Sequence, residues 1–326
     1  MMRRREFIAG LGSAAACSRA VRAQERMRRI GVLLFSAEND PVSQTRLAAL
    51  RDGLEAAGWT EGRNLQIDYR FGAADPAQLR SYADELVRIA PDVIVTGAAP
   101  ATTTVQKLTQ TIPIVFVEAT NEVGYGVTGN LAHPEGNATG ITNLYLTIGT
   151  RWLELLREAA PRVGRIALLF NPEFDSRSYI AAIEASAAAY DVKAVRTPAH
   201  NADEIEHAIG TFAAEPNGGL LVVPPSPNYT NVQLIFRLVT RYRMPAIYPT
   251  RGFAAEGGLM AYGPNSADLF RNAATYVDRI LRGAKPSELP VQFPTRFDLV
   301  VNLTAARAIG LEIPRDLIAR AAEVIE

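Results

Sequence analysis

The sequence is poor in the residues that carry covalent and metal chemistry. It has one cysteine and three histidines in 326 residues, so an internal disulfide is excluded and cysteine-bound metals lack ligands. The cysteine is Cys17, and the histidines are His133, His200 and His207. His200 and His207 could share one face of a helix, but no third ligand accompanies them. We therefore predict no metal site.

The chain also lacks net charge and long apolar runs. Its 34 basic and 34 acidic residues balance, which argues against a nucleic-acid binder held by a basic surface. The apolar stretch from Phe7 to Cys17 is too short to span a bilayer. Hydrophobic residues nevertheless make up 48%, enough for a large core. The length is typical of two domains.

The first 23 residues are rich in arginine and poor in acidic residues. Five arginines and one acid stand there, so the remaining chain has a net charge of −4. The basic start, the short apolar run and Val21-Arg22-Ala23 have the anatomy of an export signal cleaved after Ala23. Arg4-Arg5-Glu6-Phe7-Ile8 resembles a twin-arginine signal, and a general secretory (Sec) signal is the alternative. We predict a signal peptide over residues 1–23 and a periplasmic protein.

Cys17 is the residue of this leader that could carry a lipid. Ala14-Ala15-Ala16-Cys17 lacks the leucine that usually begins a lipobox, so we do not expect a lipoprotein. Cleavage after Ala23 would leave a mature chain without a thiol nucleophile.

Short apolar runs then alternate with amphipathic segments. RRIGVLLFS, from Arg28 to Ser36, predicts a buried strand, and the segment from Pro41 to Gly58 predicts a helix. The pattern continues with the strand NLQIDYRFG, the helix PAQLRSYADELVRIA, the strand PDVIVTGAA, the helix ATTTVQKLTQ and the strand IPIVFVEAT. Such alternation indicates βαβ units and a parallel sheet.

The same order begins again near residue 164. GRIALLFN echoes RRIGVLLFS, GGLLVVPPSP echoes PDVIVTGAAP, and MPAIYPTRGF echoes IPIVFVEATN. Two copies of one order predict two similar α/β lobes, and one long sheet of about ten strands is the less common alternative. The helix ADLFRNAATYVDRILRG, a proline-broken connector with the segment RFDLVV, and closing helical segments end the chain.

Ligands of open parallel sheets bind outside the carboxyl ends of the strands. The segments that follow the predicted strands carry small hydroxyl and amide residues, helix starts, aromatic residues and one arginine, which suit a small polar or zwitterionic organic ligand. Asn143 and Asn171 could bond such a ligand or brace a turn. The predicted ligand-binding residues are Ser36, Ala98, Ala99, Thr120, Asn121, Asn143, Asn171, Ser226, Tyr248, Arg251 and Tyr262.

Three of these residues have a clear alternative role. Arg251 could form a bidentate ion pair with a ligand carboxylate. Alternatively, its side chain could be solvated or could pair with Glu256. Tyr248 and Tyr262 could line the ligand cleft, but aromatic residues beside strands often belong to the core.

A glycine motif raises the question of a cofactor. Gly124, Gly126 and Gly129 form G-x-G-x-x-G after the strand IPIVFVEAT, and a dinucleotide-binding turn would need these glycines directly between a strand and a helix. Several residues intervene, and Pro134 and Gly136 break any following helix. The motif is more typical of a connector between adjacent strands. No nucleophile elbow or phosphate loop is present, so we predict no cofactor and no catalytic residue, with an exported oxidoreductase as the enzyme alternative.

Taken together, these segments resemble the solute-binding proteins of ABC transporters, and most closely the group with tryptophan/tyrosine-type binding components. The resemblance runs from the leader to the last residue. The segments that carry it, in order, are RRREFIAG, RRIGVLLFSAENDP, LEAAGWTEGRNLQIDYRFG, LVRIAPDVIVTGAAPA, IPIVFVEAT, GNATGITN, RWLELLREAAPRVGRIALLFNP, FAAEGGLMAYGPN, YVDRILRGAKPSELPVQFPTRFDLVVNLTAARAIGL and RAAEVIE.

The resemblance implies an α/β fold of the type I periplasmic-binding-protein kind. Two lobes with parallel sheets would be joined by a three-segment hinge and would close on a small-molecule solute. The N-terminal lobe would comprise residues 28–144 and 265–294, and the C-terminal lobe residues 145–264 and 295–326. The implied partner is an inner-membrane permease whose ATPase is a separate chain, and the expected state is a monomer. An exported ligand sensor that presents its closed form to a membrane receptor is the alternative.

The chain departs from these relatives at two places that matter for the ligand. After the IPIVFV strand relatives commonly have S-D-P, where this chain has Thr120-Asn121-Glu122, and an aspartate often follows the strand where Pro225-Ser226 stand here. Each place could have supplied a carboxylate to an α-ammonium group. Their loss favours a neutral or anionic ligand. The solute stays open among amino acids, aromatic acids and other small carboxylates.

Overall fold

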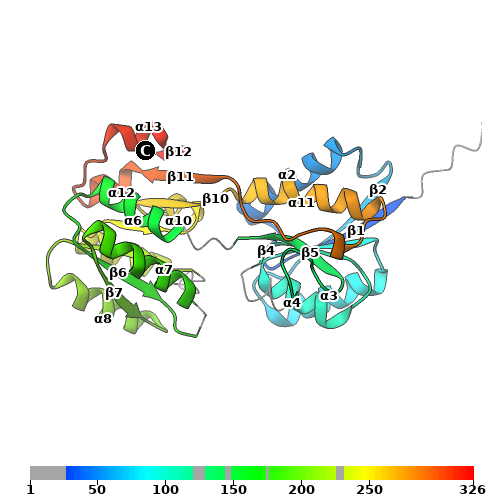
Figure 1. Ribbon diagram of the computed structural model, residues 1–326, viewed down its shortest axis with the longest axis horizontal. Coiled ribbons are helices and arrows are strands. Elements are labelled where there is room, and N and C mark those ends of the chain that lie inside the picture. The colour runs from blue at the N-terminus through cyan, green and yellow to red at the C-terminus, as the bar shows by residue number, and fades with distance from the viewer. Residues whose placement is uncertain (1–26, 120–128, 144–147, 174–175, 225–230) are drawn as a thin grey trace, which may run out of the picture. The chain divides into compact units, whose positions relative to one another are not determined.

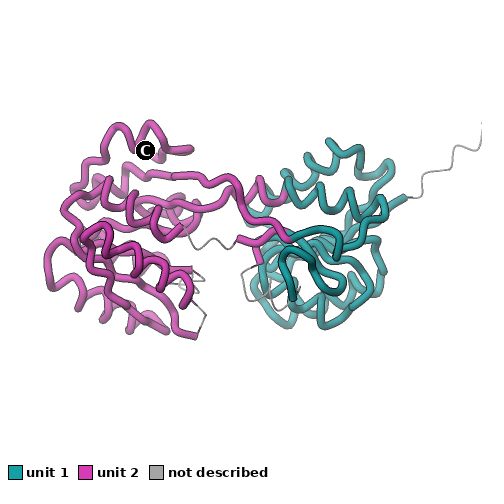
Figure 2. Tube along the Cα trace, viewed as in Figure 1, with its two compact units in different colours: residues 1–117, 127–140, 271–290 teal, residues 118–126, 141–270, 291–326 magenta. Residues whose placement is uncertain are grey.

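The chain forms two compact α/β units. The structure is a computed structural model, and it describes residues 27–119, 129–143, 148–173, 176–224 and 231–326. Within these ranges, unit 1 comprises the residues up to Val117, those from 129 to Gly140, and Arg271–Pro290. Unit 2 comprises the rest, and Figure 2 shows the two units in teal and magenta. The predicted α/β class with parallel sheets in two lobes is confirmed.

Unit 1 is built on a five-stranded sheet. Its order is β2-β1-β3-β4-β5. The neighbouring strands from β2 to β4 pair in parallel. Ile114 N donates to Asn137 O near the start of β4, and Asn143 N donates to Ala119 O at its end. Residue numbers thus rise together along both strands, so β5 runs parallel to β4. All carboxyl ends therefore lie at one edge. The strands are β1 (Arg28–Leu34), β2 (Leu65–Phe71), β3 (Val93–Gly97), β4 (Ile114–Ala119) and β5 (Ala138–Thr142).

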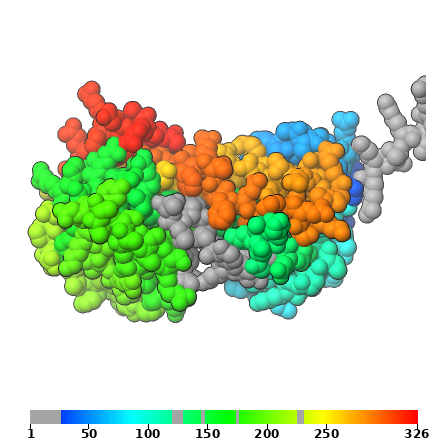
Figure 3. All heavy atoms as spheres, in the orientation of Figure 1, coloured from blue at the N-terminus to red at the C-terminus, as the bar shows by residue number. Residues whose placement is uncertain are grey.

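Helices cover this sheet, and their starts follow from local sequence. Asp40 and Asp75 each precede a proline and accept backbone N–H groups of the helix they begin, which is the preferred way to cap an N-terminus. Helix α11, which contains Ala274, lies close against helix α2, which contains Gly53. A Cβ on Gly53 would lie 2.7 Å from the Cβ of Ala274. The helices are α2 (Pro41–Ala56), α3 (Pro76–Ile89), α4 (Ala99–Leu108), the short η3 (Pro286–Glu288) and α11 (Ser266–Leu281), which begins in unit 2 and is orange in Figure 3.

Unit 2 has a seven-stranded, mostly parallel sheet. Its order is β12-β11-β10-β9-β8-β6-β7, and only the β10–β11 pair is antiparallel. The strands are β6 (Arg165–Phe170), β7 (Lys193–Pro198), β8 (Gly218–Val222), β9 (Ala246–Tyr248), β10 (Met260–Pro264), β11 (Phe297–Asn302) and β12 (Glu323–Ile325). The segment RFDLVV thus returns to this unit as a strand.

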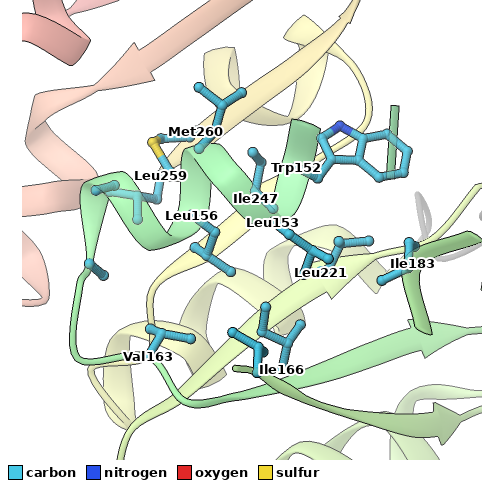
Figure 4. Packing of buried hydrophobic residues seen from close by; sticks show 14 of the residues in the cluster. Trp152, Leu153, Leu156, Val163, Ile166, Ile183, Leu221, Ile247, Leu259 and Met260 are labelled. Atoms are coloured by element: carbon cyan, nitrogen blue, oxygen red, sulfur yellow. The ribbon is translucent and has the colours of Figure 1, made fainter. Parts of the chain in front are cut away.

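Two apolar clusters hold the helices of unit 2 to the faces of its sheet. Trp152 and Leu156 of α6 lie against Ile166, Leu221 and Ile247 on one face (Figure 4). A second cluster covers the other face. The helices are α6 (Ile148–Ala159), α7 (Arg177–Ala187), η1 (Ala188–Tyr190), α8 (Ala202–Ala213), α9 (Val232–Arg241), α10 (Arg251–Ala255), α12 (Leu303–Ala308) and α13 (Arg315–Arg320), as labelled in part in Figure 1.

The end of the chain differs from the sequence prediction. The closing segment was expected to be helical throughout, but its last residues form β12, which pairs with β11 from Val300↔Glu323 to Asn302↔Ile325. A three-residue strand leaves no periodicity to detect. Pairing with a neighbouring strand decided its structure instead.

The close approach of β4 and β5 depends on a glycine. A Cβ on Gly140 would lie 2.0 Å from the carbonyl oxygen of Phe116 and 2.7 Å from its nitrogen. The φ of Gly140 is 155°, which side chains rarely adopt. The chain passes out of unit 1 directly after this residue. The close backbone contact at Gly140 therefore holds β5 against β4, and β5 is the strand from which the chain leaves unit 1.

We expect Gly140→Ala to lower the free energy of unfolding by about 3 kcal/mol, because the methyl group must push the two strands apart. Urea unfolding followed by circular dichroism measures this change. Gly164→Ala is the matched control, since a Cβ there meets nothing within 4 Å, and it should change stability by less than about 0.5 kcal/mol. Equal effects of the two substitutions would contradict the steric account.

Candidate ligand-binding loops

The loop after β1 brings serine and aspartate side chains to the carboxyl edge of unit 1. Asp40 accepts from Val42 N at 3.2 Å, Ser43 N at 3.1 Å and Ser43 Oγ at 2.7 Å. Ser36, one of the predicted ligand residues, is half-buried and forms a short hydroxyl–hydroxyl bond with Ser43. The Asp40 carboxylate thus caps the start of α2, and the Ser36 hydroxyl is held by its hydrogen bond to Ser43.

The loop after β2 is small and tightly bonded to the loop after β1. Ala73 N donates to Ser36 O at 3.2 Å, and Ala74 N donates to Phe35 O at 2.6 Å. Both alanines have left-handed backbone angles, with φ of 47° and 60°. Their side chains are single methyl groups, and the two backbone bonds tie this loop to the loop after β1.

The start of α4 is different from the starts of α2 and α3. Its N-cap is Ala98, with φ 72° and ψ 159°, and no side chain caps the helix. Ala98 N is held by Val117 O at 2.9 Å. The first-turn N–H groups of Ala99 and Ala101 have no partner within a helix, and Pro100 carries none. The predicted residues Ala98 and Ala99 therefore form a positively polarised helix end that can accept an anion.

Asn143 follows β5 and leaves one polar atom unused. Its backbone N–H donates to Ala119 O at 3.4 Å, beside the bond from Thr142 Oγ1 to the same carbonyl at 2.7 Å. Its side-chain Oδ1 is buried and has no hydrogen-bond partner among the described residues. Buried polar atoms without partners are rare, so the predicted ligand role of Asn143 keeps a physical basis.

The loop after β6 in unit 2 contains one satisfied and one unsatisfied polar side chain. Asn171 is buried, and its Oδ1 accepts from Glu173 N at 2.9 Å, which is the turn-bracing alternative. Ser176 is 2% exposed, and its Oγ has no partner in the described part of the chain. Ser176 was not among the predicted ligand-binding residues. A serine directly before a helical pattern was the available signal.

The two tyrosines differ in their access to a ligand. Tyr248 is fully buried between Phe253, which stacks on it at 5.1 Å, and Phe236, which meets it edge-on at 5.5 Å. Burial raises the pKa of its hydroxyl well above the usual value. Tyr262 is half-buried and stacks on Phe297 at 5.8 Å. Tyr248 thus belongs to the core of unit 2, and Tyr262 retains a partly open face.

Arg251 is paired, but not with Glu256. Its guanidinium donates from Nε and Nη2 to the two carboxylate oxygens of Glu323 at 2.6 and 2.7 Å, and this hydrogen bonding raises the pKa of Arg251. Glu323 begins the unpredicted strand β12, so its proximity was hidden in the sequence. A ligand carboxylate would have to replace Glu323, and a ligand role for Arg251 stays a prediction.

Three predicted residues, Thr120, Asn121 and Ser226, lie outside the described residues, as do Gly124 and Gly126. The glycine segment joins β4 to β5, which are neighbours in the sheet of unit 1. A connector between adjacent strands was the expected role.

The comparisons with known proteins agree with this architecture. Two α/β units with mostly parallel sheets, between which the chain crosses repeatedly, define the type I periplasmic-binding-protein fold. Residues 30–325 match the family model described as ABC transporter substrate binding protein. The chain belongs to this family, whose members are binding components of transport, and the match favours solute transport over the sensor alternative.

Several relatives are similar over most of the chain. A tyrosine-binding protein of Clostridioides difficile is 22% identical over 262 residues, 79% of this chain and 74% of that protein. A conserved domain protein of Vibrio cholerae has 28% identity and a TM-score of 0.77, covering 92% and 100% of the two chains. An ABC domain of Streptococcus pneumoniae in complex with L-Trp has 22% identity and a TM-score of 0.78, covering 91% and 99%.

Within the described residues, no helix has both the length and the apolar character needed to cross a membrane. The predicted signal peptide over residues 1–23 lies outside the described ranges.

Tyr248→Phe should raise the free energy of unfolding by about 1 kcal/mol, because it removes a buried hydroxyl that lacks a partner. Urea unfolding measures the change. The matched control is Tyr276→Phe, which deletes the same atom from a ring whose hydroxyl donates to Pro290 O and should cost about 1 kcal/mol. A loss of stability in Tyr248→Phe would show that its hydroxyl has a partner in solution.

Proposed function

We propose that this substrate-binding protein binds a small organic carboxylate, such as an amino acid or an aromatic acid, and delivers it in the periplasm to a membrane permease. The export signal predicted over residues 1–23 supports the periplasmic location. A permease and an ATPase on separate chains are the partners expected for the family, and a monomer is the expected state.

The observation that carries the proposal is the open start of α4. Within the described residues of unit 1, α2, α3 and α4 begin at the carboxyl edge of its sheet, and Asp40 and Asp75 cap the first two. At α4 the equivalent position is Ala98, which has no acidic or polar side chain. The backbone N–H groups and the helix dipole together favour a carboxylate there.

The small side chains at this helix start are compatible with an organic ligand of some bulk. Ala98 and Ala99 each end in a methyl group, so they leave the backbone N–H groups of the first turn accessible.

The named relatives support the same class of ligand. One is a tyrosine-binding protein, and another was solved with L-Trp. Both of these solutes are small organic carboxylates.

Ala99→Asp tests the proposal because it should change stability and binding in opposite directions. A carboxylate in the first turn of α4 stabilises the helix by about 0.3–1 kcal/mol, but it repels and replaces the carboxylate of a solute. We expect affinity for carboxylates to fall about tenfold or more. Isothermal titration with a panel of amino acids and aromatic acids measures the affinity, and thermal unfolding measures the stability.

Ala202→Asp is the matched control. It adds the same charge at the first position of α8, whose N-terminus Asn201 already caps, and it should leave affinity unchanged. If Ala99→Asp binds carboxylates as tightly as the unmodified protein does, the carboxylate does not lie at α4.

A further inference from the structure

Among the described strands the two sheets have four outer edges, and three of these edges are protected. β12 has three residues, and β7 begins at Lys193 and ends at Pro198. A further segment lies along β5, since Thr142 N donates to Gln292 O at 2.9 Å. Short strands, lysine, proline and covering segments all prevent an edge from pairing with another chain. The fourth edge is β2, which has seven residues and contains neither lysine nor proline.

The backbone of β2 alternates between its neighbour β1 and the outer edge. Asn64 O accepts a hydrogen bond from β1 at one end of the strand, and Gly72 N donates one to β1 at the other. Even-numbered residues therefore bond to β1, and odd-numbered residues direct their N–H and C=O groups away from the sheet. Both backbone groups of Leu65, the first odd-numbered residue, bond to the preceding turn. The open part of the edge thus begins at Ile67.

Three odd-numbered residues of β2 make up this open part, namely Ile67, Tyr69 and Phe71. Within the described part of the chain their outward backbone groups have one hydrogen bond, from Arg70 Nη1 to Tyr69 O at 2.8 Å. A carbonyl oxygen can accept two hydrogen bonds, so this contact guards the edge without closing it. A row of unpaired backbone groups is a template for a further strand.

The side chains of β2 complement a second copy of the same strand. In an antiparallel pair of two copies centred on Tyr69, the two tyrosines face each other. Asp68 of each copy then faces Arg70 of the other. On the opposite face of the pair, Ile67 of each copy meets Phe71 of the other. Opposite charges, aromatic pairs and contacts between aromatic and β-branched side chains all stabilise paired strands. We infer that β2 is an interaction surface for a second copy of this chain, paired antiparallel about Tyr69.

The charges of β2 are held in position for such a contact. The Asp68 carboxylate accepts from Arg29 Nε at 2.7 Å. Arg70 Nε donates to Glu85 at 2.9 Å. The side chains of Asp68 and Arg70 remain 16% and 29% exposed. Pairing of two copies would join these ion pairs into a network of alternating charges, which contributes more than an isolated surface pair.

The other face of β2 offers an apolar contact. Ile67 lines a pocket of about 40 Å³ together with Leu54 and Trp59. The ring of Phe71 from the second copy would lie beside Ile67 and extend the apolar surface at the rim of this pocket. Both faces of the strand therefore match their counterparts.

The neighbouring registers are less favourable. A pair centred on Asp68 would place two carboxylates opposite each other, and a pair centred on Arg70 would do the same with two guanidinium groups. A pair centred on Ile67 would require Leu65, whose backbone groups are already bonded. The sequence of β2 therefore selects Tyr69 as the centre.

This contact goes beyond the proposed function and does not use the start of α4, so the proposed function stands or falls independently of it. Three open residues on each strand make a small interface, and small interfaces belong to weak, transient complexes. The monomer expected for the family is then the form at low concentration, and the dimer forms as the concentration rises.

Disulfide cross-linking tests the centre of the pair in a chain whose one cysteine is removed by Cys17→Ser. Residues that face each other in a hydrogen-bonded antiparallel pair have Cα atoms about 5.5 Å apart, within the range of a disulfide. Tyr69→Cys should therefore yield a disulfide-linked dimer with oxidised glutathione, measured by non-reducing gel electrophoresis. Gln66→Cys is the matched control, because this exposed residue would lie about 20 Å from its counterpart and should not cross-link.

Sedimentation velocity measures the association itself. The dimer fraction of the unmodified chain should rise between about 10 and 500 µM. Tyr69→Lys places two like charges opposite each other and should weaken the association about fivefold or more. Tyr242→Lys, the same change at an exposed tyrosine of unit 2, should leave it unaltered. A chain that stays monomeric throughout, a dimer indifferent to Tyr69→Lys, or equal cross-linking of the two cysteine variants would overturn the inference.

Discussion

All strands of the unit 1 sheet run in one direction, and this constraint decides where the protein can bind a solute. Parallel pairing from β2 to β5 places every carboxyl end of this sheet, and the starts of α2, α3 and α4, at one edge. That edge gathers backbone N–H groups with no internal partner. The glycine at position 140 allows β5 to approach β4 closely enough to complete the sheet. The geometry of the backbone thus creates the polar edge before any side chain contributes.

The side chains then determine which helix N-termini are capped and which stay uncapped. Asp40 and Asp75 satisfy two of them, and Ala98 leaves α4 open. In unit 2 a similar selection leaves the Ser176 hydroxyl unused while Asn171 braces its own turn. An unused polar group is costly in an empty protein. A bound solute would recover that cost, which links ligand affinity to the pattern of unsatisfied atoms.

The sequence predicted the architecture well because it depends on periodicity. Alternating apolar runs and helical faces, repeated once, were sufficient for two α/β units and for most strands. The individual site residues were harder, since hydrogen bonding decides them. Arg251 faces Glu323 because a three-residue strand that no pattern reveals lies beside it. Tyr248 is enclosed by Phe236 and Phe253, and Ser176 stands out only because its hydroxyl lacks a partner.

The central claim is that the open start of α4 binds the carboxylate of the solute. The most direct measurement compares, by isothermal titration, the affinity of the unmodified protein for its best-binding acid and for the primary amide of that acid. The amide has nearly the same shape but no negative charge. The account predicts that the amide binds about tenfold or more weakly, since it loses a charge-assisted hydrogen bond at a helix N-terminus. Equal affinity for the acid and the amide would contradict it.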